Sequence, residues 1–187
     1  MTGKLIVFSA PSGSGKTTLI QWLMQQQLPI GFSVSATSRA PRAHEQDGVD
    51  YHFLSPEAFK QKIEANEFLE WEEVYPNKFY GTLTREVEQK LQKGQHVLLD
   101  VDVKGGIHIK ETYGKQACAI FVQPPSIDVL RDRLQKRATD SPEVIEERIS
   151  KAAYELEFAN RFDHIIINDD LEAAKKDCYS IVNQFLT

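Results

Sequence analysis

The sequence predicts an α/β fold built on a mainly parallel sheet. Short apolar runs alternate with longer stretches of helical pattern along all 187 residues, as in chains that wind helices around a parallel sheet. The apolar runs also lack the polar alternation of a sheet with one face in water, which indicates helices on both faces. We therefore expect a three-layer core of helices, sheet and helices.

The elements follow in order along the chain. Five apolar runs are predicted strands: residues 4–9, 31–36, 96–101, 117–123 and 163–168. Six stretches are predicted helices: residues 15–27, 55–65, 82–93, 126–137, 141–160 and 171–185. Two of these helices open on Ser-Pro-Glu, which supplies an N-cap, a first-turn proline and a favourable acid. Residues 32–82 are mixed and polar, and we interpret them as an insertion between core elements.

Composition excludes several classes of protein. Asp and Glu outnumber Lys and Arg by 27 to 22, which argues against broad binding of nucleic acid. No stretch approaches the roughly 20 apolar residues of a membrane span, and the N-terminal apolar run is too short for a signal peptide. Cys118 and Cys178 are too few for a disulfide framework. We expect a cytoplasmic protein whose anionic ligands are held by local basic sites.

A glycine-rich segment between the first strand and the first helix has the pattern of a phosphate-binding P-loop. Its residues are Ala10, Pro11, Ser12, Gly13, Ser14, Gly15, Lys16 and Thr17. Tight turns at the glycines would point N–H groups and the helix N-terminus at a nucleoside triphosphate. Lys16 would reach its outer phosphates, and the Thr17 hydroxyl would contact Mg²⁺. Ala10 replaces the usual first glycine, which is the mildest change possible there.

Two further groups of side chains fit a second phosphate and a metal. Arg39 and Arg42 lie close together with Tyr51 downstream, and guanidinium forks bind phosphate bidentately. Asp100 and Asp102 end a predicted buried strand and project to the same side if it is extended. Carboxylates at that end of a parallel strand lie where α/β ligands bind. Asp100 is our candidate for an indirect Mg²⁺ ligand that acts through water. Asp102 is our candidate for the other ligand, and exchange of these two roles stays open.

Together with the P-loop, three segments make the chain resemble the guanylate kinases from about residue 5 to residue 170. The segments are 68–71 (FLEW), 77–82 (NKFYGT) and 99–102 (LDVD). The resemblance implies transfer of a phosphoryl group from ATP to GMP, with Mg²⁺. It implies one domain over residues 1–187, with a core (1–33, 83–125 and 149–187), an inserted GMP-binding subdomain (34–82) and a helical lid (126–148).

The resemblance also implies roles for individual residues. The guanine would face Ser35, Glu70, Thr82 and Asp102, and the GMP phosphate would face Arg39, Arg42, Tyr51 and Tyr80. A carboxylate such as Glu70 accepts from both N1–H and the 2-amino group of guanine, whereas adenine would leave it buried and unpaired. The residues expected to act on the transferred phosphoryl group are Lys16, Arg39, Arg133, Arg137 and Arg148.

Alternatives remain at this stage. The lid arginines could instead pair with Asp132, Glu146 or Glu147. A non-catalytic interaction module of this fold would bind phosphorylated peptides, but such a module should lack the P-loop lysine and the lid arginines. Another small kinase of this fold would act on a different nucleotide or a phosphorylated sugar, and Glu70 with Asp102 favours guanine. The expected partners are the small molecules ATP and GMP.

Overall fold

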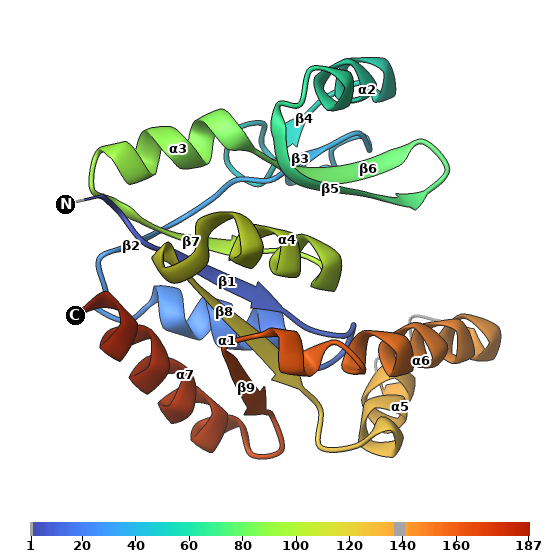
Figure 1. The fold of residues 1–187 in the computed structure, drawn as a ribbon. Coiled ribbons are helices and arrows are strands. Elements are labelled where there is room, and N and C mark those ends of the chain that lie inside the picture. The colour runs from blue at the N-terminus through green and yellow to red at the C-terminus, as the bar shows by residue number, and fades with distance from the viewer. Residues whose placement is uncertain (1, 137–140) are drawn as a thin grey trace.

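The computed structural model describes residues 2–136 and 141–187. Its main sheet has five parallel strands in the order β2-β7-β1-β8-β9 (Figure 1). The strands are β1 (Leu5–Ser9), β2 (Ile30–Phe32), β7 (His96–Asp100), β8 (Ala117–Gln123) and β9 (His164–Ile167). The central strands β1 and β8 are apolar and almost wholly buried, as expected for a sheet covered on both faces. The predicted α/β class is confirmed.

Helices cover both faces of this sheet. Helices α1 (Lys16–Met24) and α7 (Leu171–Leu186) lie on one face, where their apolar side chains pack with Ile6, Phe8 and Ile120. Helices α3 (Thr84–Gln92) and α4 (Val103–Tyr113) lie on the other face (Figure 1). Successive residues of β1 therefore supply two separate apolar cores, one on each side of the sheet.

The structure differs from the sequence-based elements at several places, of which the following bear on the site. The single strand predicted over 31–36 is two strands, β2 in the main sheet and β3 (Ala36–Thr37) in a second sheet. Helix α4 was missed, because Gly105 and Gly106 look like helix breakers. Both glycines have a packing reason: a Cβ would lie 2.7 Å from Asp102 Oδ1 at Gly105 and 2.5 Å from Ser9 Oγ at Gly106. The helix expected from residue 82 begins at Thr84, since β6 runs to Leu83.

The predicted insertion folds as a small sheet of its own, in the order β4-β3-β6-β5. Its other strands are β4 (His52–Phe53), β5 (Phe68–Tyr75) and β6 (Lys78–Leu83). Helix α2 (Pro56–Glu64) covers it, with Phe59 stacked between Phe68 and Phe79. Ser55 caps this helix by accepting from the Ala58 N–H, as its Ser-Pro-Glu sequence predicts. We call residues 34–82 the acceptor segment.

Helices α5 (Ile127–Lys136) and α6 (Pro142–Leu156) pack on one another at the edge of the molecule, beyond the P-loop (Figure 1). Two short 3-10 helices, η1 (Gly114–Gln116) and η2 (Ala159–Arg161), lead into β8 and β9. Arg137, one of the expected lid arginines, lies outside the described residues. The two helices occupy the place where the lid is expected.

Both cysteines are buried side by side with the apolar residues between the sheet and helices α1 and α7. Burial raises the pKa of each thiol, Cys118 and Cys178, to about 12. Neither forms a disulfide, as the sequence predicts. Among residues 2–136 and 141–187, the structure has no helix of the length and apolar character that crossing a bilayer requires.

Candidate active site

The P-loop connects the end of β1 to the start of α1. Gly13 and Gly15 have φ angles of 93° and 92°, a left-handed conformation that other residues adopt only at a cost. The Ser14 N–H donates to the Pro11 carbonyl at 3.1 Å, which closes the turn. Gly15 is the N-cap of α1 and has no side chain to satisfy the first N–H groups of the helix. Such a turn at a helix N-terminus is suited to bind an anion.

Lys16 lies at the start of α1 and points toward the end of the neighbouring strand β7. Its ammonium group forms an ion pair with Asp100 and donates to the Val101 carbonyl at 3.2 Å. Thr17 is exposed beside it and lines the same cleft. The lysine, the hydroxyl and the carboxylate predicted for triphosphate and metal are therefore neighbours, although they come from two separate parts of the sequence.

The P-loop forms one wall of an open cleft of about 490 Å³. Tyr80 and Asp102 contribute to the facing wall, and Arg148 and Lys151 of helix α6 border the cleft. One guanidinium nitrogen of Arg148 donates to Ser12 Oγ at 3.2 Å, so this arginine already touches the P-loop. The cleft therefore joins the phosphate loop, the lid helices and the acceptor segment.

A second, smaller pocket of about 190 Å³ adjoins this cleft. Five of the predicted GMP-binding residues line it: Ser35, Tyr51, Glu70, Tyr80 and Asp102. The residues that border both spaces are Glu72, Tyr80, Asp100, Val101 and Asp102. Because the two pockets share these walls, a ligand in the small pocket would meet a phosphate chain held by the P-loop.

Glu70 lies on β5 at the inner end of the small pocket. Thr82 Oγ1, on the neighbouring strand β6, donates to Glu70 Oε1 at 2.6 Å. Burial raises the pKa of the Glu70 carboxyl to about 7, the Thr82 hydrogen bond opposes this, and the charge of Asp102 adds to it. The second carboxyl oxygen remains able to accept a hydrogen bond from a ligand. A carboxyl group with one oxygen held in place is suited to accept hydrogen bonds from adjacent N–H groups of a ligand.

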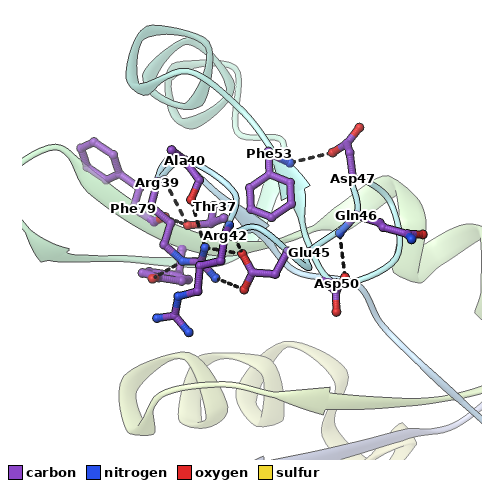
Figure 2. A network of polar contacts seen from close by, with 11 residues as sticks. Thr37, Arg39, Ala40, Arg42, Glu45, Gln46, Asp47, Asp50, Phe53 and Phe79 are labelled. Carbon is purple, nitrogen blue, oxygen red and sulfur yellow. Dashed lines mark hydrogen bonds and ion pairs between the residues drawn. The ribbon is translucent and has the colours of Figure 1, made fainter. Parts of the chain in front are cut away.

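Arg39 follows β3 and is fixed by a polar network (Figure 2). Its two terminal nitrogens donate to the Glu45 carboxylate at 2.6 and 2.7 Å, and Nε donates to the Tyr80 hydroxyl at 3.2 Å. The guanidinium also lies 4.9 Å from the centre of the Tyr51 ring. Hydrogen bonding to Arg39 lowers the pKa of Glu45 to about 2, and the same bond raises the pKa of Arg39. A strongly fixed cation thus contacts Tyr51 and Tyr80, two of the residues that line the small pocket.

Asp102 lies beyond the end of the strand that carries Asp100, so the two carboxylates come from different elements, although both line the cleft and the small pocket. Strand β7 ends at Asp100, and Asp102 is the N-cap of α4, where its carboxylate accepts from the Gly105 N–H at 2.7 Å. Burial raises the pKa of Asp102, while the Gly105 hydrogen bond opposes this shift. Asp100 pairs with Lys16, whereas Asp102 caps α4 beside the acceptor pocket, which both aspartates line. This placement favours Asp100 for the metal and Asp102 for the guanine.

The remaining predicted arginines differ in placement. Arg42 is exposed, and its backbone N–H donates to the Glu45 carboxylate at 2.8 Å. Arg133 on α5 donates to the Asn168 carbonyl at 2.7 Å, so it holds the end of β9. Glu146, one of the alternative partners named for the lid arginines, pairs instead with Arg131, for which the sequence predicted no role.

Sequence reasoning missed three residues of this region: Glu45, Lys151 and Asn168. Glu45 is one of several charges in a polar loop, and nothing in its spacing indicates that it binds Arg39. Lys151 pairs with Glu72 at 3.3 Å, across the cleft from α6 to β5. Asn168 carried a usable signal, because a polar residue at the carboxyl end of a parallel strand lies at the ligand-binding edge of the sheet.

A phosphate loop on a parallel sheet adjoins a second pocket that is lined by carboxylates and by two tyrosines in contact with a fixed arginine. This combination defines a P-loop nucleotide phosphotransferase. The guanylate kinase family model matches residues 2–185. The chain is 60% identical over 186 residues to the guanylate kinase of Bacteroides thetaiotaomicron, covering 100% of this chain and 91% of that protein. It is 53% identical to the guanylate kinase of Porphyromonas gingivalis, covering 98% of each.

Structural comparison agrees with these sequence matches. The crystal structure of guanylate kinase from Anaplasma phagocytophilum superposes with a TM-score of 0.77 and 29% identity, covering 100% of this chain and 87% of that one. The chain belongs to the guanylate kinase family. It is an enzyme that transfers a phosphoryl group from ATP to GMP to give ADP and GDP.

Proposed function

We propose that this reaction runs where the two pockets meet, with ATP on the P-loop and GMP in the pocket of the acceptor segment. The observation that carries the proposal is the shared wall of Tyr80, Asp100 and Asp102. It lets two nucleotides approach tail to tail, the in-line arrangement that phosphoryl transfer needs. ATP would contact the eight P-loop residues from Ala10 to Thr17, chiefly through backbone N–H groups.

GMP would be recognised both at its guanine base and at its phosphate. Glu70 would accept from the guanine N1–H and 2-amino groups, with Thr82 holding its other oxygen and with Ser35 and Asp102 alongside. At the other end, Arg39, Tyr51 and Tyr80 would bind the phosphate, and Arg42 would reach it from the exposed loop. Guanine is favoured because adenine offers neither donor and would leave a buried carboxylate unpaired.

Catalysis would rest on cations around the transferred group. Lys16 would leave Asp100 for the outer phosphates of ATP, and Arg148, already at Ser12, would neutralise charge from the lid side. Arg39 would hold the attacking phosphate, which is ionised and needs no general base. Arg133 and Arg137 keep the lid roles proposed for them, with Arg133 anchored at Asn168 before closure. Fixed cations that meet charge developing in the transition state are usually the largest catalytic contribution.

The donor set of Thr17 and Asp100 fits Mg²⁺. A hydroxyl and a carboxylate are hard oxygen ligands, and Mg²⁺ in such sites takes only one or two protein oxygens beside the substrate phosphates. Consistent with that, the described residues contain no cluster of three His, Cys, Asp or Glu side chains that would form a separate metal cage. When bound, Mg²⁺ would neutralise phosphate charge, with Asp100 acting directly or through water.

A panel of acceptors tests this proposal. Release of ADP is measured with GMP, dGMP, AMP and UMP, and with Lys16→Met as the inactive control. We expect turnover with GMP to exceed that with AMP and UMP by at least about 100-fold. Comparable turnover with AMP would contradict the guanine-reading role of Glu70. Full activity of Lys16→Met would contradict the assignment of ATP to the P-loop.

We also propose the division into a core, an acceptor segment (34–82) and a lid (126–148), and a cytoplasmic location. The separate small sheet of the acceptor segment and the paired helices α5 and α6 support the division. Two buried, unpaired thiols and two nucleotide substrates support a reducing, nucleotide-rich compartment.

A further inference from the structure

Asn168 lies directly after β9 at the edge of the sheet that faces the P-loop, and it is only 5% exposed. Its backbone N–H donates to the Gln123 carbonyl of β8 at 2.8 Å. Its side-chain amide is not exposed to solvent but reaches across to the P-loop. A buried amide needs partners for its donors, so each of its bonds fixes something.

The side-chain amide of Asn168 donates to the Ser14 carbonyl in the middle of the P-loop, at 2.7 Å. The two residues are 154 positions apart in the sequence, and the bond is buried. An anion-binding loop works only when its N–H groups point at the anion, so its carbonyls must point away and be satisfied elsewhere. Asn168 satisfies the carbonyl next to Gly15 from the rear of the loop.

The side-chain amide of Asn168 packs directly against Gly15. A Cβ on residue 15 would lie 2.1 Å from Asn168 Nδ2, so only glycine leaves room for the amide. Gly15 also has the left-handed φ of 92° that turns the chain from the loop into helix α1. The amide therefore stands in the space that the missing side chain creates, at the point where the loop changes direction.

The same residue is linked to the lid. The Asn168 backbone carbonyl accepts from an Arg133 guanidinium nitrogen at 2.7 Å, and Arg133 lies on α5. Gly13 is in contact with this helix too, since a Cβ there would lie 2.9 Å from Leu130 Cδ1. Asn168 thus touches the strand edge, the phosphate loop and the first lid helix.

We propose that Asn168 is a positioning residue for phosphoryl transfer, whose buried amide fixes the Ser14 carbonyl so that the P-loop N–H groups stay directed at the ATP phosphates. The inference rests on the proposed ATP site and deepens it. Without the amide, the Ser14 carbonyl would be buried and unpaired, and the loop would rotate to find another donor. Asn168 is not among the described residues that line the acceptor pocket, so we expect its substitution to leave GMP affinity unchanged.

The test compares Asn168→Ala, Lys16→Met and the surface control Asn183→Ala, each checked by circular dichroism and thermal melting. ATP and GMP affinities are measured separately by calorimetry, and kcat by ADP release. We expect Asn168→Ala to weaken ATP binding about tenfold, with GMP affinity within about twofold and Asn183→Ala like the wild type. Unchanged ATP affinity in Asn168→Ala, or equal losses for both nucleotides, would overturn the inference.

A second variant separates positioning from folding. Asn168→Asp keeps the shape but presents a carboxylate that cannot donate to Ser14. We expect its ATP affinity to match that of Asn168→Ala at pH 8 and to recover as pH falls and the carboxyl gains a proton, whereas Asn168→Ala shows no recovery. If this recovery is absent, the inference about Asn168 is overturned, but the proposed ATP site is not. If Lys16→Met also bound ATP normally, the ATP site itself would be wrong and both proposals would fall.

Discussion

The two ends of the active site are built on opposite principles. The P-loop end is one continuous segment whose proposed binding groups are mainly backbone N–H groups, with the Lys16 side chain beside them and with Gly13 and Gly15 in left-handed conformation. The acceptor end is assembled from side chains on β3, β5, β6 and the intervening loop, joined by the Arg39–Glu45 and Thr82–Glu70 hydrogen bonds. One end depends on where the main chain can turn, and the other depends on which side chains are charged.

This difference predicts how each end fails. Backbone N–H groups do not titrate, so the P-loop end should be insensitive to pH and very sensitive to added volume. The acceptor end contains Glu70 with a pKa of about 7 and should respond to neutral pH. Substitutions that preserve shape but alter charge should therefore damage the acceptor end, and substitutions that add a methyl group should damage the P-loop end.

The largest effect is expected at Gly15. Gly15→Ala places a methyl group 2.1 Å from Asn168 Nδ2 in a left-handed backbone, so the loop must distort. We expect ATP affinity to fall by about 100-fold, with GMP affinity unchanged, as measured by calorimetry. Gly114→Ala is the control, because its φ is also positive but its Cβ would meet nothing within 4 Å. If both variants bound ATP equally well, ATP affinity would not depend on the absence of a side chain at residue 15.

Glu70→Gln should come next and act on the other end. The amide keeps the size of the side chain but can accept only through its carbonyl oxygen, and its NH₂ faces the guanine donors. We expect kcat/KM for GMP to fall by about 100-fold and KM for ATP to change by less than about twofold. Glu67→Gln, at an exposed carboxylate paired with Lys62, should be neutral. An increase in KM for ATP as large as that for GMP would contradict the separation of the two ends.

The pH dependence of KM sharpens the comparison. Because GMP needs ionised Glu70 and its pKa is about 7, we expect KM for GMP to rise about tenfold from pH 8 to pH 6. KM for ATP should stay nearly flat. The GMP phosphate titrates in the same range, so Glu70→Gln, which retains only that contribution, is the control. Identical profiles for the two proteins would remove Glu70 as the cause.

The stability of the fold should respond to pH in the opposite sense to GMP binding, because protonation of Glu70 weakens binding but favours the folded state. The folded-state pKa of Glu70 lies above its ordinary value of 4.5, so the folded state holds a proton that the unfolded state has lost between pH 4.5 and pH 7. The free energy of unfolding of the wild type, relative to Glu70→Gln, should therefore decrease as pH rises through this window. Urea titrations at pH 5 and pH 7.5 measure it. A relative increase would mean that the carboxyl is stabilised in its ionised form.

The smallest effect on nucleotide binding is expected at the ion pair that joins helix α6 to strand β5 across the cleft. The Lys151–Glu72 ion pair spans the cleft at 3.3 Å, but the Lys151 side chain is 53% exposed, and exposed pairs contribute little. Lys151→Ala and Glu72→Ala should each change KM for GMP by less than about fivefold, and the double variant should resemble either single one. In 0.5 M salt the difference in KM for GMP between these variants and the wild type should vanish. If the losses of the two single variants instead add up in the double variant, each residue binds a nucleotide independently of the ion pair.

Sequence patterns located the P-loop end better than the acceptor end. A continuous motif between a strand and a helix specifies the backbone path by itself, so residues 10–17 could be placed without any tertiary information. Arg39, Arg42 and Tyr51 could be proposed for a phosphate from their chemistry alone, whereas the guanine-facing residues needed a family resemblance. Glu70 is chemically indistinguishable from its acidic neighbours until burial raises its pKa. Their individual roles stay predictions that the acceptor panel and the variants test.

The errors have a common physical cause, which is contact between distant parts of the chain. Gly105 and Gly106 break helices in isolation, yet here they allow α4 to approach Glu70, Asp102 and Ser9. The chain divides the predicted strand over 31–36 between two sheets because it leaves the core there. Asn168 touches Ser14 from 154 positions away, a distance over which local patterns carry no information.

The buried thiols have a practical consequence. The thiolate is the form that reacts with oxidants and alkylating reagents, and the raised pKa of both thiols keeps the thiolate scarce at neutral pH. Cys118 and Cys178 are also shielded between the sheet and two helices. We therefore expect iodoacetamide to label these thiols only when the packing between the sheet and helices α1 and α7 opens, so that the labelling rate reports this opening.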